Sequence, residues 1–343
     1  MKKTVQIAVD AMGGDQGIAV TIPAVLMALK KFPQLEIFLV GDRRLLEESL
    51  ESSCSSDSYQ KRLHLRHAAQ TVEMADSPRD SFRTKKDSSM RVSLDLLADK
   101  EVQGVVSAGN TGALVVTATL VVKKIKGIFR PALIARLPTN KPNHDIWILD
   151  LGANVEVSSE VLFQFALMGT IMAGTTDQVE KPKVALLNIG SEKIKGEQRI
   201  KEAATLFEES SFLNYVGFIE ADDIFFSDVD VIVCDGILGN VLLKCLEGTV
   251  KFFKAQIRSI LSENFLTKLL GLLSILFLGK IKKRFDTDRY NGADLIGLNG
   301  VVVKSHGNAS VSGFIAAIGQ AITEIEIMVP DLIANRTKEI FSS

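Results

Sequence analysis

The sequence is poor in the residues that mark several common classes of protein. Its 343 residues include only three cysteines, one tryptophan and three tyrosines. The cysteines form neither a CxxC pair nor a metal-ligand spacing, so we expect no disulfide framework and a reducing, cytoplasmic location. The formal net charge of −1 argues against a nucleic-acid-binding protein, which would need a strongly basic face.

Several catalytic and targeting motifs are also missing. The sequence has no GxSxG nucleophile elbow and no GxGxxG dinucleotide fingerprint. The uncharged stretch 269–279 is too short to span a membrane, which takes about 20 apolar residues. The first residues reach Asp10 too soon for a signal peptide, which again favours a cytoplasmic protein.

Short apolar runs alternate with helical segments along the whole chain. Runs typical of buried strands occur at 5–9, 37–40, 102–106, 132–136, 146–149, 184–187, 231–234 and 301–303. Helical segments are expected at 22–32, 113–120 and 159–173, and a serine-rich surface loop at 49–58. The pattern predicts an α/β protein of three layers, α/β/α, with a mainly parallel sheet. We expect one catalytic unit over 1–343, with one lobe of 1–155 plus 308–343 and another of 156–307.

Six of these strands are followed by loops rich in Gly, Asn, Asp and Ser. The central loop, 107–112, lies between a strand and a helix, so its N–H groups and the helix dipole suit a phosphate or another compact anion. Such turns also serve as plain tight connections. Because ligands of parallel sheets bind where strands end and helices begin, six such loops on one edge would make an anion-binding cleft.

Few side chains near these loops are equipped for covalent catalysis. Cys234 lies in an apolar strand and is expected to be buried and inert. His306 is the one histidine at a strand exit and could act as an acid or base. A site without its own nucleophile suits transfer to an anion that is itself the nucleophile, such as phosphate attacking an activated acyl group.

The region 246–285 departs from the α/β pattern. Apolar residues recur at helical spacing from Leu246 to Leu261, and the stretch 269–279 is followed by basic residues that suit anionic headgroups. The pattern predicts a projecting helical pair. A subunit interface, a hairpin at a membrane surface and plain core packing stay open as interpretations.

Blocks at 7–15, 85–90, 107–113, 125–127, 130–132, 149–154, 187–190, 195–196, 235–236, 239–241 and 306–307 occur in one collinear order. Through them the chain resembles, over about 5–330, the PlsX-type phosphate acyltransferases of bacterial phospholipid synthesis. The resemblance implies transfer of a long-chain fatty acyl group from acyl carrier protein to inorganic phosphate. The acyl phosphate would then serve a membrane glycerol-3-phosphate acyltransferase.

The resemblance further implies a fold like that of isocitrate and isopropylmalate dehydrogenases and of phosphotransacetylases. It implies a homodimer, contact with an anionic membrane surface, and no metal or organic cofactor. The chain departs from the family pattern at Ile237-Leu238, where Phe-Thr is usual, and at Asp222, where arginine is usual. Ser191 replaces a usual threonine but keeps the hydroxyl group.

The matched loops supply the candidate site. We expect catalytic roles for Lys195, His306 and Asn110. The candidate substrate and phosphate ligands are Asp10, Gly13, Gly14, Asp15, Lys85, Lys86, Ser88, Ser89, Ser107, Gly109, Thr111, Gly112, Asp150, Asn154, Asn188, Ser191, Asp235 and Asn240. The alternatives are a phosphotransacetylase-like enzyme acting on acyl-CoA, a fold-related dehydrogenase, which the missing GxGxxG turn disfavours, and a non-catalytic acyl-carrier or membrane scaffold.

Overall fold

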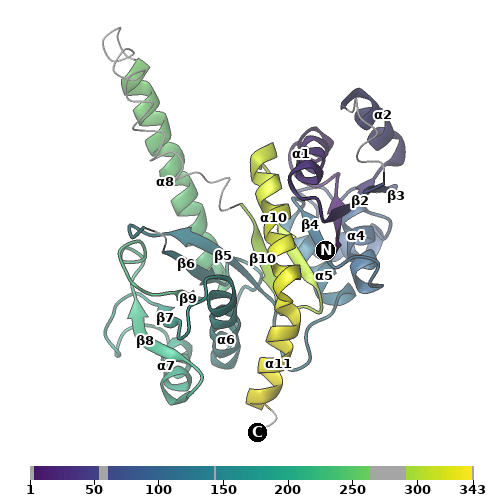
Figure 1. The fold of residues 1–343 in the computed structure, drawn as a ribbon. Helices are drawn as coiled ribbons and strands as arrows, with labels where there is room; N and C mark the ends of the chain where they lie inside the picture. Colours follow the sequence, from purple (N-terminus) through teal and green to yellow (C-terminus); the bar gives the residue numbers. More distant parts are fainter. Residues whose placement is uncertain (1–3, 54–60, 143, 263–290, 342–343) are drawn as a thin grey trace.

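The computed structural model describes residues 4–53, 61–142, 144–262 and 291–341 (Figure 1). Its centre is one sheet of eleven strands, in the order β3-β2-β1-β4-β11-β10-β5-β6-β9-β7-β8. The strands are β1 (Val5–Asp10), β2 (Leu35–Gly41), β3 (Leu63–His67), β4 (Gly104–Ser107), β5 (Ala132–Pro138), β6 (Asp145–Leu149), β7 (Lys183–Leu187), β8 (Asn214–Ile219), β9 (Val231–Val233), β10 (Ala293–Ile296) and β11 (Val301–Lys304). The strands predicted from apolar runs are confirmed.

Helices cover both faces of the sheet. They are α1 (Ile18–Lys31), α2 (Arg43–Ser53), α3 (Pro78–Thr84), α4 (Ser89–Ala98), α5 (Thr111–Val121), α6 (Ser159–Thr176), α7 (Gln198–Glu209), α8 (Gly236–Ser262), α10 (Val311–Ile327) and α11 (Val329–Phe341). Alternate strand residues face opposite sides, so Ala8 joins the core under α4 and α5, whereas Ile7 and Val9 join the core under α1 and α10. A third core packs α6, α7 and α11 on the other half of the sheet. The predicted three layers are confirmed.

The sheet consists of two parallel halves that run in opposite directions. Strands β3, β2, β1, β4 and β11 are parallel to one another, and so are β6, β9, β7 and β8. Between the halves, β10 pairs antiparallel with β11 and β5, and β5 pairs antiparallel with β6. The prediction that all six polar loops share one sheet edge is therefore wrong, because the central antiparallel strands reverse the direction.

The loops instead form two sets. We call the loops after β1, β4 and β11 the first loop group, and those after β6, β7 and β9 the second loop group. The predicted loop at 49–58 is also wrong in part, because α2 continues through Ser53, supported by ion pairs Arg43–Glu47 and Arg44–Glu48 one turn apart. Residues 54–60 lie outside the described part of the chain. The division into lobes stays a prediction.

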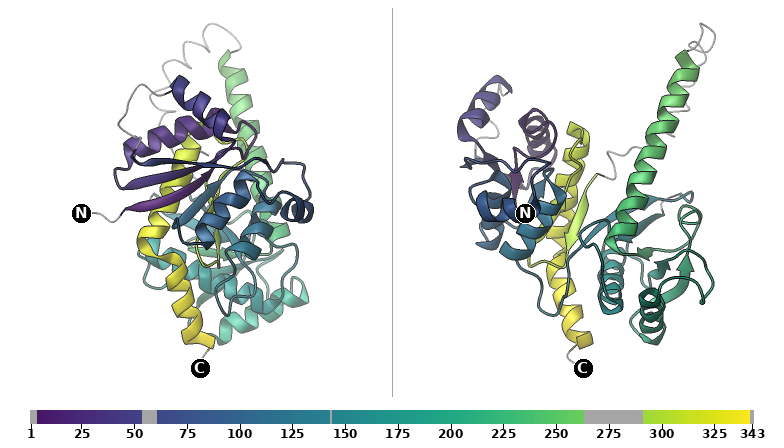
Figure 2. Two further views of the ribbon diagram at one scale, coloured as in Figure 1. Left: turned by 90° about the vertical axis from the view of Figure 1, so that its right-hand side faces the viewer. Right: turned by 180° about the vertical axis from the view of Figure 1, so that it is seen from behind.

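Helix α8 projects well beyond the sheet (Figures 1 and 2). Residues 251–260 are all exposed, including Phe252, Phe253, Ile257 and Ile260. The first helix of the predicted projecting pair is thus present, whereas 269–279 lies outside the described residues. Within those residues, no single helix is long and apolar enough to cross a membrane; the bent pair α10–α11 passes the test by length and composition.

Candidate functional site

A row of three polar side chains closes the first half of the sheet. Asp10 of β1 pairs in register with Ser107 of β4, and Ser107 pairs with Lys304 of β11. Residues in register on adjacent strands share a face, and here it is the face covered by α4 and α5. All three are buried, with exposed fractions of 1%, 0% and 8%. Buried polar groups need partners, which the neighbouring loops provide.

Two serine hydroxyls hold the Asp10 carboxyl group. Ser89 Oγ donates to Oδ1 at 2.6 Å, and Ser107 Oγ donates to Oδ2 at 2.6 Å. Ser107 Oγ also accepts from the Gly109 N–H at 3.1 Å. Burial raises the pKa of Asp10, and the hydrogen bonds from Ser107 and Ser89 oppose that rise. The predicted ligands Asp10, Ser89 and Ser107 are therefore brought together, but they bind one another.

Glycines let the loops of the first group pack closely. A Cβ on Gly13 would lie 2.6 Å from Asp10 Oδ2, and one on Gly14, whose φ is +90°, would lie 2.9 Å from the Gly307 carbonyl oxygen. The Asp15 N–H donates to that same carbonyl at 2.7 Å. The loops after β1 and β11 are thus joined directly, and only glycine fits at the two contact points.

Lys304 is a functional candidate that the sequence analysis missed. Its ammonium group donates to the carbonyl oxygens of Ala108, at 3.4 Å, and Ser305. Burial, and then the positive charge of Lys244, lower the pKa of Lys304 to about 8, although the carboxylates of Asp10 and Asp15 oppose the shift. No sequence pattern marked this lysine, because its burial depends on β11 lying between β4 and β10.

His306 lies beside a charged turn of α8. Its Nδ1 is 3.7 Å from Glu247 Oε1, and both Glu247 oxygens accept from Lys244 Nζ at 3.1 Å. The His306 backbone N–H donates to Asn291 Oδ1 at 2.9 Å, which fixes the loop. Burial lowers the pKa of His306, although the charge of Glu247 opposes this. A neutral imidazole can accept a proton.

Asn110 and Lys85 hold the loop that precedes α3. Asn110 caps α5: its Oδ1 accepts from the Ala113 N–H at 3.0 Å, while its Nδ2 donates to the carbonyl oxygens of Met74 at 2.9 Å and Asp76 at 3.1 Å. Lys85 pairs with the Asp76 carboxylate, and its hydrogen bond lowers the pKa of Asp76. The predicted catalytic residue Asn110 and the predicted ligand Lys85 therefore bind protein groups beside the first loop group.

The other candidates at this edge differ in exposure. Ser88 is buried and caps α4, accepting an N–H of its own helix at 3.3 Å. Thr111 and Gly112 are half-buried in the first turn of α5, and Lys86 is exposed. A Cβ on Gly112 would lie 2.7 Å from a proline of α3. The N-termini of α4 and α5 thus meet at the polar row.

Asp150 is the centre of the second loop group. Its Oδ1 accepts from the N–H groups of Leu133, Gly152 and Ala153 at 3.0, 3.2 and 2.9 Å. Its Oδ2 accepts from the backbone N–H and the side-chain Nδ2 of Asn154, each at 2.8 Å. Burial raises the pKa of Asp150, and the hydrogen bonds from Ala153 and Asn154 oppose the rise. Asp150 therefore shapes its loop rather than presenting a free carboxylate.

Helix α8 begins against this loop. A Cβ on Gly236 would lie 2.1 Å from the Asn154 carbonyl oxygen, and one on Gly239 would lie 1.9 Å from that of Asp150. Any larger residue at either position would push the helix away. Asn240, one residue further, is exposed.

Asp235 anchors the same helix end. Its Oδ1 accepts from the Leu238 N–H at 2.8 Å, and its Oδ2 pairs with Arg199 of α7. Sequence analysis missed Arg199, since nothing in the sequence connects α7 with the end of β9. Asp235 is thus a helix anchor and not a free ligand.

The loop after β7 contains the remaining candidates. Asn188 Nδ2 donates to the Lys195 carbonyl oxygen at 3.3 Å, and the Ser191 N–H donates to Glu220 Oε1 at 3.2 Å. Lys195 Nζ lies 2.8 Å from Glu192 Oε2, and that hydrogen bond raises the pKa of Lys195. These contacts stay within the second half, so none of them joins Lys195 to His306.

One face of α8 connects the two loop groups. Asn240, Lys244, Glu247 and Lys251 follow one another at intervals of four, three and four residues and so share a face. Asn240 lies beside the loop of Gly152, within 3.4 Å of that glycine's Cβ position, whereas Glu247 reaches His306. About 10 Å of helix, from Asn240 to Glu247, thus spans from the second group to the first.

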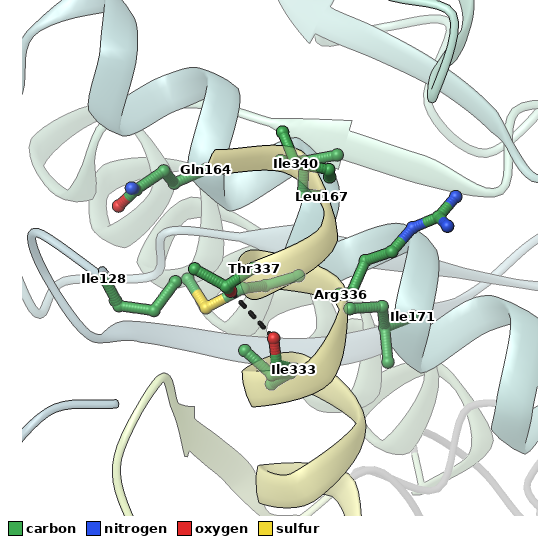
Figure 3. A pocket seen from close by; sticks show the side chains of 9 residues that line it. Ile128, Gln164, Leu167, Ile171, Ile333, Arg336, Thr337 and Ile340 are labelled. Atoms are coloured by element: carbon green, nitrogen blue, oxygen red, sulfur yellow. Dashed lines mark hydrogen bonds between the residues drawn. The ribbon is translucent and has the colours of Figure 1, made fainter. Parts of the chain in front are cut away.

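A small pocket lies between α6 and α11 (Figure 3). Ile128, Leu167, Met168, Ile171, Ile333 and Ile340 are among its lining residues. It is mainly apolar and shares no lining residue with either loop group. In the described part of the chain, no group of three or more His, Cys, Asp or Glu residues could hold a metal ion.

Comparison with known proteins identifies the family. The sequence model of the family described as "Fatty acid synthesis protein" matches residues 5–331. The chain belongs to this family. A relative from Hydrogenovibrio crunogenus named "Phosphate acyltransferase" is 47% identical over 341 residues, covering 99% of both chains. One of the same name from Legionella pneumophila (strain Paris) is 44% identical, covering 99% of this chain and 98% of the relative.

Solved structures support the fold of this family member. EutD phosphotransacetylase from Staphylococcus aureus matches with a TM-score of 0.57 at 17% identity, over 94% of each chain. A phosphotransacetylase from Streptococcus pyogenes matches with a TM-score of 0.59 at 15% identity, over 95% of this chain and 94% of that one. The predicted likeness to phosphotransacetylases is confirmed at the level of the fold.

Proposed function

We propose that this protein transfers a long-chain fatty acyl group from acyl carrier protein to inorganic phosphate. Family membership and relatives named phosphate acyltransferases support the reaction class. The observation that carries the proposal is the first loop group, where the N-termini of α4 and α5 meet a polar row beside His306. Helix N-termini favour anions, and a histidine of lowered pKa can exchange protons.

The reaction needs one bond formed, one broken and one proton moved. A phosphate oxygen bonds to the acyl carbonyl carbon, the C–S bond of the thioester breaks, and the thiol leaves. His306 takes the proton of hydrogen phosphate and returns it to the thiolate, so no proton is gained or lost overall. The N–H groups of residues 110–112 hold the phosphate, and fixed dipoles stabilise the developing oxyanion.

The candidate residues divide into two kinds. Asp10, Asn110, Lys85, Asp150 and Asp235 build the loops, because their polar atoms already bind protein groups. Thr111, Lys86, Asn240 and Lys195 keep side chains that are at least partly exposed and stay candidates for substrate contact, with Lys195 supplying charge for the thioester.

We also propose that the protein works as a cytoplasmic homodimer at an anionic membrane surface, where a glycerol-3-phosphate acyltransferase takes up the product. The exposed apolar side chains of α8 support this, since a soluble surface rarely exposes several large apolar residues together. Replacing Phe253 and Ile257 by glutamate should abolish dimerisation in sedimentation or binding to anionic vesicles. If both are unchanged, α8 serves neither purpose.

The deciding experiment mixes the purified protein with palmitoyl-acyl carrier protein and phosphate and traps acyl phosphate with hydroxylamine. Parallel reactions contain palmitoyl-CoA, acetyl-CoA or no phosphate. We expect hydroxamate only from the carrier-protein substrate, only with phosphate present, and not from the His306→Gln variant.

Two other functions predict different results. A phosphotransacetylase-like activity, which the fold of the solved relatives favours, would give product from acetyl-CoA. A non-catalytic scaffold would give no product with any substrate and would tolerate changes at His306. Absence of product from a folded protein would overturn the proposed activity.

A further inference from the structure

Two lysines outside the predicted site residues lie near His306, and the role given to them here rests on the proposed transfer to phosphate. We propose that Lys304 and Lys244 bind the phosphate nucleophile between them, and that Glu247 positions His306 against it. Lys304 comes from the first half of the sheet and Lys244 from α8, so both parts of the molecule complete the phosphate site.

Lys304 is buried, and burial of a charged lysine lowers the stability of the fold unless the charge has a partner or a function. Only 8% of it is exposed, and lysines are almost never buried without a partner of opposite charge. It takes part in none of the ion pairs within the described residues, and its hydrogen bonds go to two carbonyl oxygens. Those carbonyls belong to the loops leading into α5 and α10, so the ammonium group lies among the loops expected to hold the anion.

Lys244 is held beside the same loops. It is 59% exposed, and Glu247 binds its ammonium through both carboxylate oxygens at 3.1 Å. Glu247 Oε1 also lies 3.7 Å from His306 Nδ1. One carboxylate therefore lies against both the lysine and the imidazole.

Lys244 and His306 both lie against Glu247, and His306 follows Lys304 by two residues, so the two ammonium groups belong to one cluster. The charge of Lys244 acts on both Lys304 and His306, and it lowers the pKa of each. Like charges gathered at one place reduce stability, and such arrangements cluster at functional sites. A doubly charged phosphate bound between the lysines would replace that repulsion by two attractions, and it would lie next to the imidazole that takes its proton.

The arrangement also predicts a pH limit. The pKa of Lys304 is lowered to about 8, so phosphate affinity should fall as the pH rises through that value. The Lys304→Arg variant keeps its charge above pH 8 because arginine stays protonated, so its affinity should decline less over the same range.

The test measures binding of inorganic phosphate alone, by calorimetry and by phosphorus NMR, with no acyl donor present. We expect Lys304→Met and Lys244→Met each to weaken phosphate binding at least tenfold, and to raise the KM for phosphate more than they lower kcat. Lys254→Met, an exposed lysine further along α8, is the matched control and should change binding less than twofold. Glu247→Gln should lower kcat and shift the pH profile assigned to His306.

The outcomes separate this proposal from the activity itself. Unchanged phosphate affinity in Lys244→Met, on an exposed helix face where misfolding is not a concern, would overturn the two-lysine site even if Lys304→Met did not fold. Phosphate binding that depends on both lysines, without any acyl transfer, would support the site and overturn the proposed activity. Absence of phosphate binding by the unaltered protein would overturn the site.

Discussion

Asp10 and Asp150 stand at matching places in the two halves of the sheet, yet they are held in different ways. Each lies at the end of a strand, is buried, and has a pKa raised by burial. Asp10 is bound by hydroxyl groups 79 and 97 residues away. Asp150 is bound mainly by N–H groups of the next four residues. One aspartate joins distant elements, and the other folds its own loop.

The comparison shows why the halves contribute differently to the site. The partners of Asp10 bring α4, β4 and the loop after β1 to one point, so the first loop group is assembled by tertiary contacts. In the second loop group, the loop after β6 is held mainly by its own N–H groups, and α8 starts against it.

Replacing Asp150 by asparagine should have the largest effect. Five N–H groups donate hydrogen bonds to the two carboxylate oxygens of Asp150. The single amide oxygen of asparagine can accept only some of these bonds, so buried N–H groups lose their partners. We expect about 3 kcal/mol or more of lost stability, measured by urea unfolding. If Asp150→Asn and Asp10→Asn unfold at the same urea concentration, the different hydrogen-bond partners of the two aspartates do not change the free energy of unfolding.

The Asp10→Asn variant should lose less stability than Asp150→Asn. Its activity should fall more, relative to the stability that it loses. Its two side-chain partners are hydroxyl groups, which can rotate to donate or accept, so we expect a loss of about 2 kcal/mol. The loops after β1 and β4 would still shift, and turnover in the hydroxylamine assay should fall about tenfold, roughly 1.4 kcal/mol of barrier. Full activity of Asp10→Asn would show that the polar row does not shape the site.

Removing the cap of α5 should have a smaller effect on stability. Asn110→Ala loses the cap and the hydrogen bonds to the loop before α3, which should cost about 1–2 kcal/mol. We expect turnover to fall about tenfold, or roughly 1.4 kcal/mol of barrier, while the protein stays folded. Asn110→Asp keeps the cap but not the donated hydrogen bonds, so it separates the two contributions. Unchanged turnover and phosphate affinity in Asn110→Ala would remove this loop from the site.

A second pair of buried acids, Asp294 and Glu324, tests the effect of burial outside the loops. Gln320 Nε2 donates to Asp294 at 2.9 Å and to Glu324 at 3.3 Å, and burial raises the pKa of both acids. Because the folded state then binds more protons than the unfolded state, this contribution to stability is present at acidic pH and is lost as the pH rises through the raised pKa values.

Glu324→Gln should therefore be more stable than the unaltered protein at pH 8, by about 1 kcal/mol, and nearly equal to it at pH 5. Thermal unfolding across that pH range measures the difference. Exposed Glu326→Gln is the control and should follow the unaltered protein. If the stability of Glu324→Gln falls with rising pH in parallel with that of the unaltered protein, the acid pair has the same pKa values in the folded and unfolded states.

The sequence predicted where the strands lie along the chain better than it predicted their order and direction in the sheet. The apolar runs at 5–9 and 146–149 are confirmed as strands because burial on both faces leaves a continuous apolar pattern. Strand β10 was missed, since four residues containing a buried aspartate do not resemble a strand. Without β10 the reversal between the halves could not be foreseen.

The candidate residues show the same limit. Loop motifs located Asp10, Ser107 and Asn110 near one another, and His306 beside them. The pairing of Asp235 with Arg199 and the burial of Lys304 depend on contacts between elements far apart in the chain, which spacing in one sequence does not report. Burial and long-range partners therefore decided which polar residues are structural.

The place of β11 has a consequence for how the protein is made. It inserts between β4 and β10 although about 200 residues separate it from β4, so a growing chain leaves that edge of β4 unpaired until nearly everything has been synthesised. At about 5–20 residues per second, Lys304 is synthesised on the order of 15–60 seconds after Asp10. During that interval an apolar strand edge is open to pairing with other chains, and a chaperone that covers it would decide how much enzyme the cell obtains.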